Sequence, residues 1–191
     1  MATVVSVTSE KVAFEWKAQE EAAALYPVTL LVAQVRPICM KRILREAVSL
    51  GVREIIVTGA DTADRSYQDA KLWSTGEYRK YLLDGAMQSG YTGMSELRFA
   101  MRVDNLKDDF SRMENLVLLD NVLGGERLAD FSYTYGSVLL AIGPERGWSS
   151  RERQVFVDSG FNPYSLGKRV LRTETACSVG TAILLGRMGL L

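Results

Sequence analysis

The chain has 191 residues, is 47% hydrophobic and contains only four prolines, a composition that predicts one well-buried domain. It contains no histidine, which excludes histidine zinc sites and Ser-His-Asp or Cys-His catalytic groups, and we expect no metal. Its 23 basic and 23 acidic residues balance, so the total charge does not predict indiscriminate binding to phosphate backbones.

The chain has no apolar run of the length that a membrane helix needs, and no basic segment followed by an apolar run at its N-terminus, so we expect a cytoplasmic protein. The two cysteines, Cys39 and Cys177, lie far apart in apolar helical contexts. This favours two reduced, buried thiols over a disulfide.

The chain divides into a short N-terminal segment and one larger unit. Residues 1–26 combine a β-like run with a charged, alanine-rich stretch and are too short to bury a core, so we interpret them as an arm or a remnant. Residues 27–191 are expected to form the domain. Its expected strands are residues 28–35, 54–58, 94–102, 116–119, 137–142 and 163–166. Its expected helices are residues 39–50, 77–89, 104–113, 149–159 and 173–186, and residues 61–74 are expected to form a loop.

The alternation of strands and helices predicts an α/β domain in which helices flank a parallel sheet. Ser149 and Glu152 have the spacing of a capping box, and Gly160 suits a left-handed helix end with Phe161 packed back on Phe156. In the last helix, the small residues at 176 and 180 predict close packing against the core or another subunit.

Three glycine-bearing loops follow expected strands: the turn after Leu119, residues 143–147 and residues 165–172. In open α/β sheets, ligands bind at the edge where the strands end. The chain has no G-x-G-x-x-G after the first strand and no G-x-x-x-x-G-K-[ST], which excludes the ordinary dinucleotide and P-loop sites. The loops alone predict a ligand site, with plain turns as the alternative.

The C-terminal motifs are more specific than the loops taken singly. They read IGPERGWS at 142–149, GF at 160–161 and LGKRVLRTETA at 166–176. This block resembles the 16S rRNA uridine-N3 methyltransferase family, which belongs to the SPOUT, or α/β-knot, methyltransferases. Weaker matches extend the resemblance over residues 28–191.

The resemblance implies a C-terminal deep trefoil knot, a homodimer, and S-adenosylmethionine bound in a bent form in the knot. It also implies a set of cofactor-binding residues. Backbone polar groups and apolar packing at Leu166, Gly167, Val170 and Leu171 are expected to hold the adenine. In the loop after the preceding strand, the expected cofactor contacts are Ile142, Gly143, Glu145 and Gly147, where the glycines let the backbone approach closely.

Two features depart from the family pattern. Arg146 occupies a position where many relatives have a second glycine, so it either crowds the cofactor or supplies a charge for the substrate. The relatives also usually have an N-terminal β-rich RNA-binding domain, and residues 1–26 are then an arm or a remnant of it.

The implied reaction is methyl transfer to N3 of a uridine in 16S rRNA, which needs in-line positioning of the acceptor and loss of its imide proton. Without histidine, Glu145, Glu174 or water can take the proton, and Arg172 can stabilise negative charge on the base. Thr173 and Glu174 also have a structural alternative, since Thr caps helices and Glu complements the helix dipole in the first turn. For Arg172 the alternative is an ion pair within the fold.

Other residues could contact RNA. Trp148 and Tyr164 could stack on a flipped base, although packing in the core is the preferred interpretation. Two groups of basic residues are candidate RNA contacts. The first is Arg36, Lys41, Arg42 and Arg45, for which a solvated helix face is the alternative. The second is Lys168, Arg169 and Arg172. The competing functions are a methyltransferase for another RNA nucleotide and a non-catalytic knot protein that binds RNA or the cofactor.

Overall fold

The computed structural model describes residues 1–17 and 24–191. Its N-terminal part is an antiparallel hairpin of β1 (Ala2–Val7) and β2 (Val12–Trp16). The first strand was expected as a β-like run, whereas the second, with its alternating apolar residues, was missed. Residues 18–23 of the expected arm lie outside the described residues, and the boundary at residue 27 stays a prediction.

The main sheet has seven strands in the order β5-β4-β3-β8-β6-β9-β7, and every neighbouring pair is parallel. The strands are β3 (Tyr26–Ala33), β4 (Val52–Thr58), β5 (Glu96–Ala100), β6 (Asn115–Leu119), β7 (Glu126–Arg127), β8 (Val138–Ile142) and β9 (Asn162–Ser165). The expected parallel α/β sheet is therefore confirmed, with β7 as an additional two-residue edge strand.

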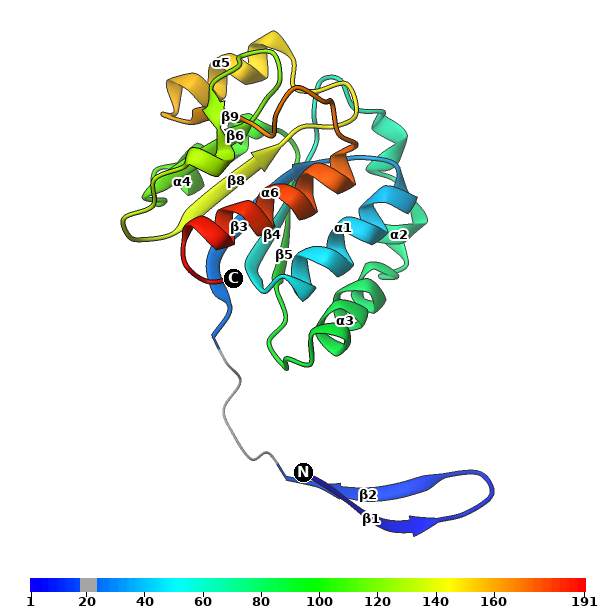
Figure 1. Cartoon of the computed structure of the whole chain (residues 1–191). Coiled ribbons are helices and arrows are strands. Elements are labelled where there is room, and N and C mark those ends of the chain that lie inside the picture. Colours follow the sequence, from blue (N-terminus) through cyan, green and yellow to red (C-terminus); the bar gives the residue numbers. More distant parts are fainter. Residues whose placement is uncertain (18–23) are drawn as a thin grey trace.

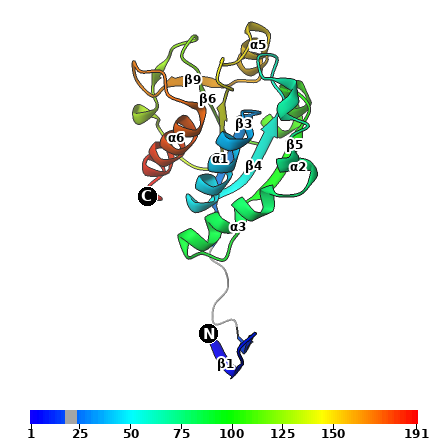
Figure 2. The ribbon, with the colours of Figure 1, turned by 90° about the vertical axis from the view of Figure 1, so that its right-hand side faces the viewer.

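Helices cover both faces of this sheet (Figures 1 and 2). One face carries α1 (Pro37–Ser49), α3 (Tyr78–Ser89) and α6 (Thr173–Arg187), and the other carries α4 (Lys107–Phe110) and α5 (Ser150–Asp158). Shorter helices lie in the connections: η1 (Arg65–Tyr67), α2 (Lys71–Ser74), η2 (Val103–Leu106) and η3 (Leu128–Asp130).

The core has two layers because successive strand residues point to opposite faces. In β3, Leu30 and Val32 pack in the layer under α1, α3 and α6, while Leu31 and Ala33 pack in the layer under α4 and α5. All four side chains are fully buried. The continuous apolar run at this strand thus reflects burial on both faces, as expected for a parallel sheet.

The expected ends of α5 are confirmed. The Ser149 hydroxyl accepts a hydrogen bond from the Glu152 N–H, and the Glu152 carboxylate accepts one from the Ser149 N–H. After the helix, Gly160 has a φ of 86°, and the rings of Phe161 and Phe156 pack edge to face with centroids 4.8 Å apart.

Several boundaries differ from expectation. The region 61–74 was expected to be a loop but contains η1 and α2, whose single turns are too short to show a helical period. The expected helix at 104–113 begins as η2 and continues as α4. Among the described residues, no helix has the length and apolar character to cross a membrane. The trefoil knot stays a prediction.

Candidate functional site

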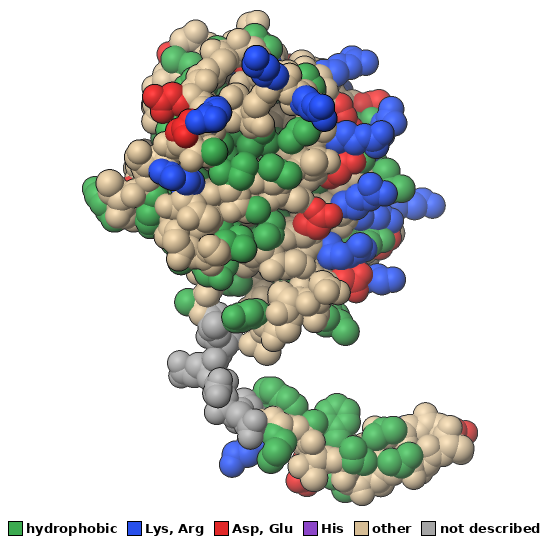
Figure 3. Space-filling view, in the orientation of Figure 1, with side chains coloured by type: hydrophobic (Ala, Val, Ile, Leu, Met, Phe, Trp, Pro, Cys, Tyr) green, Lys and Arg blue, Asp and Glu red, His purple; other side chains and the backbone are tan. Residues whose placement is uncertain are grey.

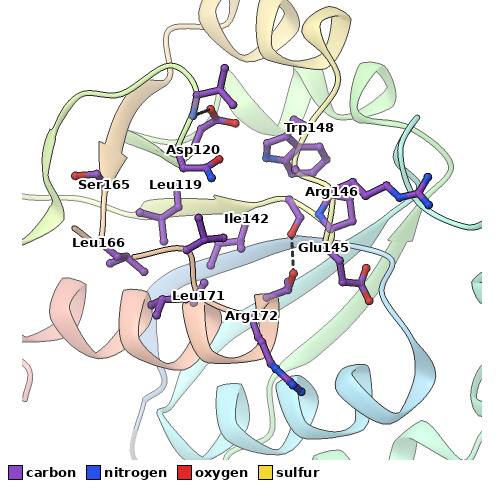
Figure 4. A pocket seen from close by; sticks show the side chains of 18 of the residues that line it. Leu119, Asp120, Ile142, Glu145, Arg146, Trp148, Ser165, Leu166, Leu171 and Arg172 are labelled. Carbon is purple, nitrogen blue, oxygen red and sulfur yellow. Dashed lines mark hydrogen bonds between the residues drawn. The ribbon is translucent and has the colours of Figure 1, made fainter. Parts of the chain in front are cut away.

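A pocket of about 680 Å³ lies at the edge of the sheet where β6, β8 and β9 end (Figure 4). The three loops singled out in the sequence meet there, together with the first turns of α1 and α6. The lining residues are Arg36, Cys39, Leu119, Asp120, Asn121, Val122, Ile142, Gly143, Pro144, Glu145, Arg146, Gly147, Trp148, Arg153, Tyr164, Ser165, Leu166, Gly167, Arg169, Val170, Leu171, Arg172, Thr173, Glu174 and Ala176. All ten predicted site residues are among them.

The loop after β8 is held from two sides. The Thr173 hydroxyl at the start of α6 donates to the Gly143 carbonyl at 3.3 Å, and the Thr62 hydroxyl donates to the Gly147 carbonyl at 2.5 Å. The expectation that Thr173 caps α6 is wrong, because Arg172 is the N-cap residue and no side chain caps this end. Thr173 instead connects α6 to the β8 loop.

Glycine is required in this loop for two different reasons. Gly147 has a φ of 69°, which side chains rarely tolerate. A Cβ at Gly143 would lie 3.1 Å from the Trp148 backbone nitrogen, so this glycine allows the loop to fold tightly upon itself. The close approach at Gly143 is therefore made by the loop's own backbone, and an approach to a cofactor stays a prediction.

The apolar part of the lining gathers on one side of the pocket. Figure 4 shows the side chains of Leu119, Ile142, Leu166 and Leu171 close together there. Ile142 is buried, Leu166 and Leu171 are half-buried, and Val170 is 79% exposed. These side chains offer an apolar surface to a ligand. Val170 is part of that surface only if a ligand or a second chain covers its exposed side chain.

Glu174 is a buried carboxylate in the first turn of α6. It is 7% exposed, and its Oε1 atom has no hydrogen-bond partner among the described residues. The nearest cation is Arg42, whose Nη1 lies 4.0 Å from that oxygen. Burial and the neighbouring Glu174 carboxylate raise the pKa of the Cys39 thiol. The pocket wall thus contains an acceptor that a bound group can use.

Two arginines of the lining point outward. Figure 4 shows the Arg172 side chain extending away from Leu119 and Ile142, and the Arg146 side chain extending away from Trp148. Within residues 1–17 and 24–191, Arg172 has no ion-pair partner within 4.0 Å. These residues therefore do not support the alternative in which Arg172 forms an ion pair within the fold. Both guanidinium groups are available at the rim of the pocket.

The aromatic residues lie in packed positions. Trp148 is 1% exposed and packs against Phe156 with ring centroids 4.9 Å apart. Tyr164 packs edge to face against Phe131 at 5.7 Å. Both rings therefore pack against other aromatic rings, which agrees with the preferred interpretation. Both also line the pocket.

The basic residues of α1 are largely paired. Lys41 Nζ lies 2.6 Å from Glu77, and Arg45 Nη2 lies 3.8 Å from Asp84. Figure 3 shows basic side chains along this side of the molecule with acidic side chains among them. This group has the character of a solvated helix face, whereas Arg36 also lines the pocket, where its backbone N–H donates to Glu145.

Sequence reasoning identified Ser149 and Glu152 only as a capping box and missed their contacts with the loop after β4, which brace the pocket from the side. Glu152 accepts hydrogen bonds from the Asp61 and Ser149 backbone N–H groups, and Arg151 forms an ion pair with Asp61 at 2.9 Å. Arg151, together with the Ser149 hydroxyl, lowers the Asp61 pKa from 3.8 to about 2. In the sequence, the loop after β4 shows only a polar stretch without period. Its role becomes recognisable only when it is known which loops meet in the fold.

Comparisons with known proteins agree with this geometry. The family described as RNA methyltransferase domain matches residues 21–185. Ribosomal RNA small subunit methyltransferase E of Treponema pallidum is 34% identical, over 95% of this chain and 71% of the relative. Ribosomal RNA small subunit methyltransferase E 1 of Borreliella burgdorferi is 31% identical, over 85% of this chain and 68% of the relative.

Solved structures share the fold. A methyltransferase of Legionella pneumophila in complex with S-adenosylmethionine superposes with a TM-score of 0.79 at 23% identity, over 97% of this chain and 77% of that one. Ribosomal RNA small subunit methyltransferase E of Neisseria gonorrhoeae, bound to S-adenosylmethionine, gives 0.74 at 20% identity, over 97% and 77%. Given the family match across most of its length, the chain belongs to the RNA methyltransferase family that its C-terminal motifs resemble.

Proposed function

We propose that this protein transfers a methyl group from S-adenosylmethionine to N3 of a uridine in small-subunit ribosomal RNA, in the cytoplasm. The observation that carries the proposal is the pocket at one sheet edge. It combines an apolar surface, an outward-pointing arginine and a buried carboxylate whose Oε1 has no hydrogen-bond partner among the described residues. The names of the Treponema and Borreliella relatives support the class of RNA.

The pocket suits this cofactor. Its volume of about 680 Å³ lies in the usual range of ligand sites, about 300–1,000 Å³. Leu166 and Leu171 would pack against the adenine, and the backbone of their loop would meet its polar edge. The Glu174 carboxylate adds negative charge to a wall that would face a positively charged ligand.

When bound, S-adenosylmethionine supplies an electrophilic methyl group. The chain's own residues would orient the uridine and handle its N3 proton, because N3 becomes a nucleophile once that proton leaves. Glu174, whose Oε1 has no partner among the described residues, would accept the proton. Arg172 would reach over the rim and hold a base oxygen on which negative charge develops.

We also propose that the protein acts as a homodimer. Helices α1 and α6 pack against each other, and each leaves an apolar side chain exposed, Ile38 at 65% and Val179 at 38%. Because the pocket is lined by the first turns of both helices, a second copy placed on them would cover its rim. Light scattering should give twice the chain mass of 21.2 kDa, and a monomer at micromolar concentration would refute the dimer.

The activity test uses small ribosomal subunits from cells that lack the modification, a labelled methyl donor, and mass mapping of the product. Arg172→Ala should lower methylation at least 10-fold, which corresponds to about 1.4 kcal/mol, and leave S-adenosylhomocysteine binding intact. Arg112→Ala, an exposed arginine remote from the pocket lining, is the control and should behave as native. Binding of the cofactor without any methyl transfer would favour the non-catalytic protein, and a label on another nucleotide would refute uridine N3.

A further inference from the structure

The mouth of the pocket has an excess of positive charge. Among the lining residues one carboxylate is exposed, Glu145, whereas four arginines are exposed: Arg36, Arg146, Arg169 and Arg172. In the part of the chain that the structure describes, none of the four has an acidic partner within 4.0 Å. Because basic and acidic residues balance over the whole chain, this excess is local, and it attracts an anion to the mouth.

Two of these arginines, Arg36 and Arg146, come from different loops and face the same short helix, η1. Arg36 follows β3, and the Tyr67 hydroxyl in η1 lies beside its guanidinium and is the main cause of its raised pKa. Arg146 lies in the loop after β8. The pKa of Asp64, the N-cap residue of η1, is lowered mainly by hydrogen bonds from Ser66 and in part by Arg146. Both cations therefore border the surface between η1 and the pocket.

The fold itself does not use the charge of either side chain. Arg36 contacts Glu145 through its backbone N–H, at 3.3 Å, and this contact does not need the guanidinium. Asp64 Oδ1 is already occupied, because it accepts from the Ser66 N–H at 2.9 Å and from the Ser66 hydroxyl at 2.7 Å. A hydroxyl such as that of Tyr67 can orient a guanidinium without neutralising it. The two positive charges are thus available to an anion from outside.

Glu145 separates this pair of arginines from the other side of the mouth. Figure 4 shows the Arg146 and Arg172 side chains leaving the pocket in different directions, with the Glu145 carboxylate between them. An anion is attracted at either side and repelled at the centre. An RNA strand has the matching alternation, because its phosphates are charged and its bases are not. The mouth therefore fits a strand whose base enters at the centre while its phosphates lie at the sides.

We propose that Arg36 and Arg146 bind the RNA phosphate on the η1 side of the target uridine. The inference rests on the proposed function and deepens it, since it names how the RNA strand crosses the site. The contact is made to the backbone, so it positions the strand without reading its sequence. The planar guanidinium fork matches two oxygens of one phosphate, and Tyr67 holds the Arg36 fork beside η1.

The test measures the binding of small ribosomal subunits that lack the modification, at about 50 and about 200 mM salt and constant Mg²⁺. Each phosphate contact releases counterions, so this fourfold rise in salt weakens binding by about threefold per contact. In the double variant Arg36→Gln/Arg146→Gln, the ratio of the dissociation constants at high and low salt should therefore be about threefold smaller than in native protein. At low salt its affinity should be about 10-fold lower, and KM for the subunits should rise more than kcat falls.

Matched variants separate charge from shape. Arg112→Gln removes an exposed arginine outside the pocket lining and should change neither the affinity nor its salt ratio. Arg36→Lys/Arg146→Lys retains both charges but loses the planar forks, so it should keep most of the salt ratio and lose part of the affinity. Thermal unfolding checks that each variant is folded, and if the double glutamine variant is not, Arg146→Gln alone decides.

The outcomes separate the phosphate contact from the proposed function. If native protein transfers no methyl group to the subunits, the proposed function fails and the contact with it. If native protein methylates them and the double glutamine variant binds them with native affinity and salt ratio, the function stands and the contact is refuted. A matching loss of S-adenosylhomocysteine affinity in calorimetry would assign the arginines to the cofactor. A fall in kcat with an unchanged dissociation constant would assign them to the chemical step, and either result overturns the proposal.

Discussion

Replacement of Glu152 should both destabilise the protein and loosen its pocket. This carboxylate is 1% exposed, and each of its oxygens accepts one backbone N–H: Oε1 from Asp61 at 2.9 Å and Oε2 from Ser149 at 2.8 Å. Glu152→Ala leaves both N–H groups without their acceptor and breaks the capping box of α5. The two loops that it joins, after β4 and after β8, lose a direct connection.

The size of the effect follows from the two hydrogen bonds. Hydrogen bonds to a charged group are worth about 1.5–3 kcal/mol each, so Glu152→Ala should lower the free energy of unfolding by about 3 kcal/mol or more. Glu152→Gln keeps the shape but retains only one accepting oxygen, and its NH₂ group faces an N–H. It should cost about half as much as the alanine variant.

Urea unfolding measures the stability, and calorimetry with S-adenosylhomocysteine measures the pocket. We expect the affinity to fall in the same order as stability, native above glutamine above alanine, because the β8 loop lines the site. A loss below about 1 kcal/mol for Glu152→Ala would refute the reasoning, since water would then replace the carboxylate without cost. Equal losses for alanine and glutamine would show that neither the retained volume nor the one retained acceptor contributes, so that the loss follows from the charge of the carboxylate.

Two more predictions concern stability. The Asp61 pKa of about 2 lies below its ordinary 3.8, so its ionised contacts contribute their full stability above that ordinary value and lose it as the pH falls through 3.8 and then through 2. The urea-unfolding difference between native and Asp61→Asn should be under about 1 kcal/mol near pH 6, because Asp61 is partly exposed, and should shrink as the pH falls toward 2. A difference that grows on acidification would contradict the assignment. At Gly85, a Cβ would lie 2.4 Å from the Arg45 carbonyl oxygen and push α3 from α1, so Gly85→Ala should destabilise the protein by about 1–3 kcal/mol. A Cβ at Gly186 would meet nothing within 4 Å, so Gly186→Ala should stabilise α6 by up to about 1 kcal/mol. Thermal melts that shift both variants in the same direction would contradict this pair of predictions.

The features that could be predicted from the sequence have their causes within a few residues. The capping box of α5 depends on Ser149 and Glu152, three positions apart, and the left-handed end depends on Gly160 alone. The buried strands are visible because a parallel strand covered on both faces reads as an apolar run. The loops of the pocket were predicted because the strand-end loops of a parallel sheet share one edge, whereas the individual residues within them were expected from the family resemblance.

The features that were missed depend on partners far along the chain. The helix η1 and the short α2 are single turns whose residues show no period, and β7 is a two-residue strand that exists only by pairing with β9. The Arg153–Asp120 pair joins residues 33 positions apart. Neither residue belongs to a recognisable motif, so this ion pair becomes visible only when α5 and the β6 turn are placed side by side.

The loop after β4 shows why polar composition alone is a poor guide to function. Asp61 bonds to Glu152, Ser149 and Arg151, and Thr62 bonds to Gly147, across 85 to 91 positions. These side chains therefore hold the β8 loop in place and are not left over for a substrate. Glu174 and Trp148 differ in this respect, because each is buried with a polar atom that the described residues leave without a partner. Gln34 and Thr181 also have a buried polar atom without a partner among the described residues, but neither lines the pocket. Incomplete hydrogen bonding therefore indicates a ligand only where it occurs in the wall of a pocket.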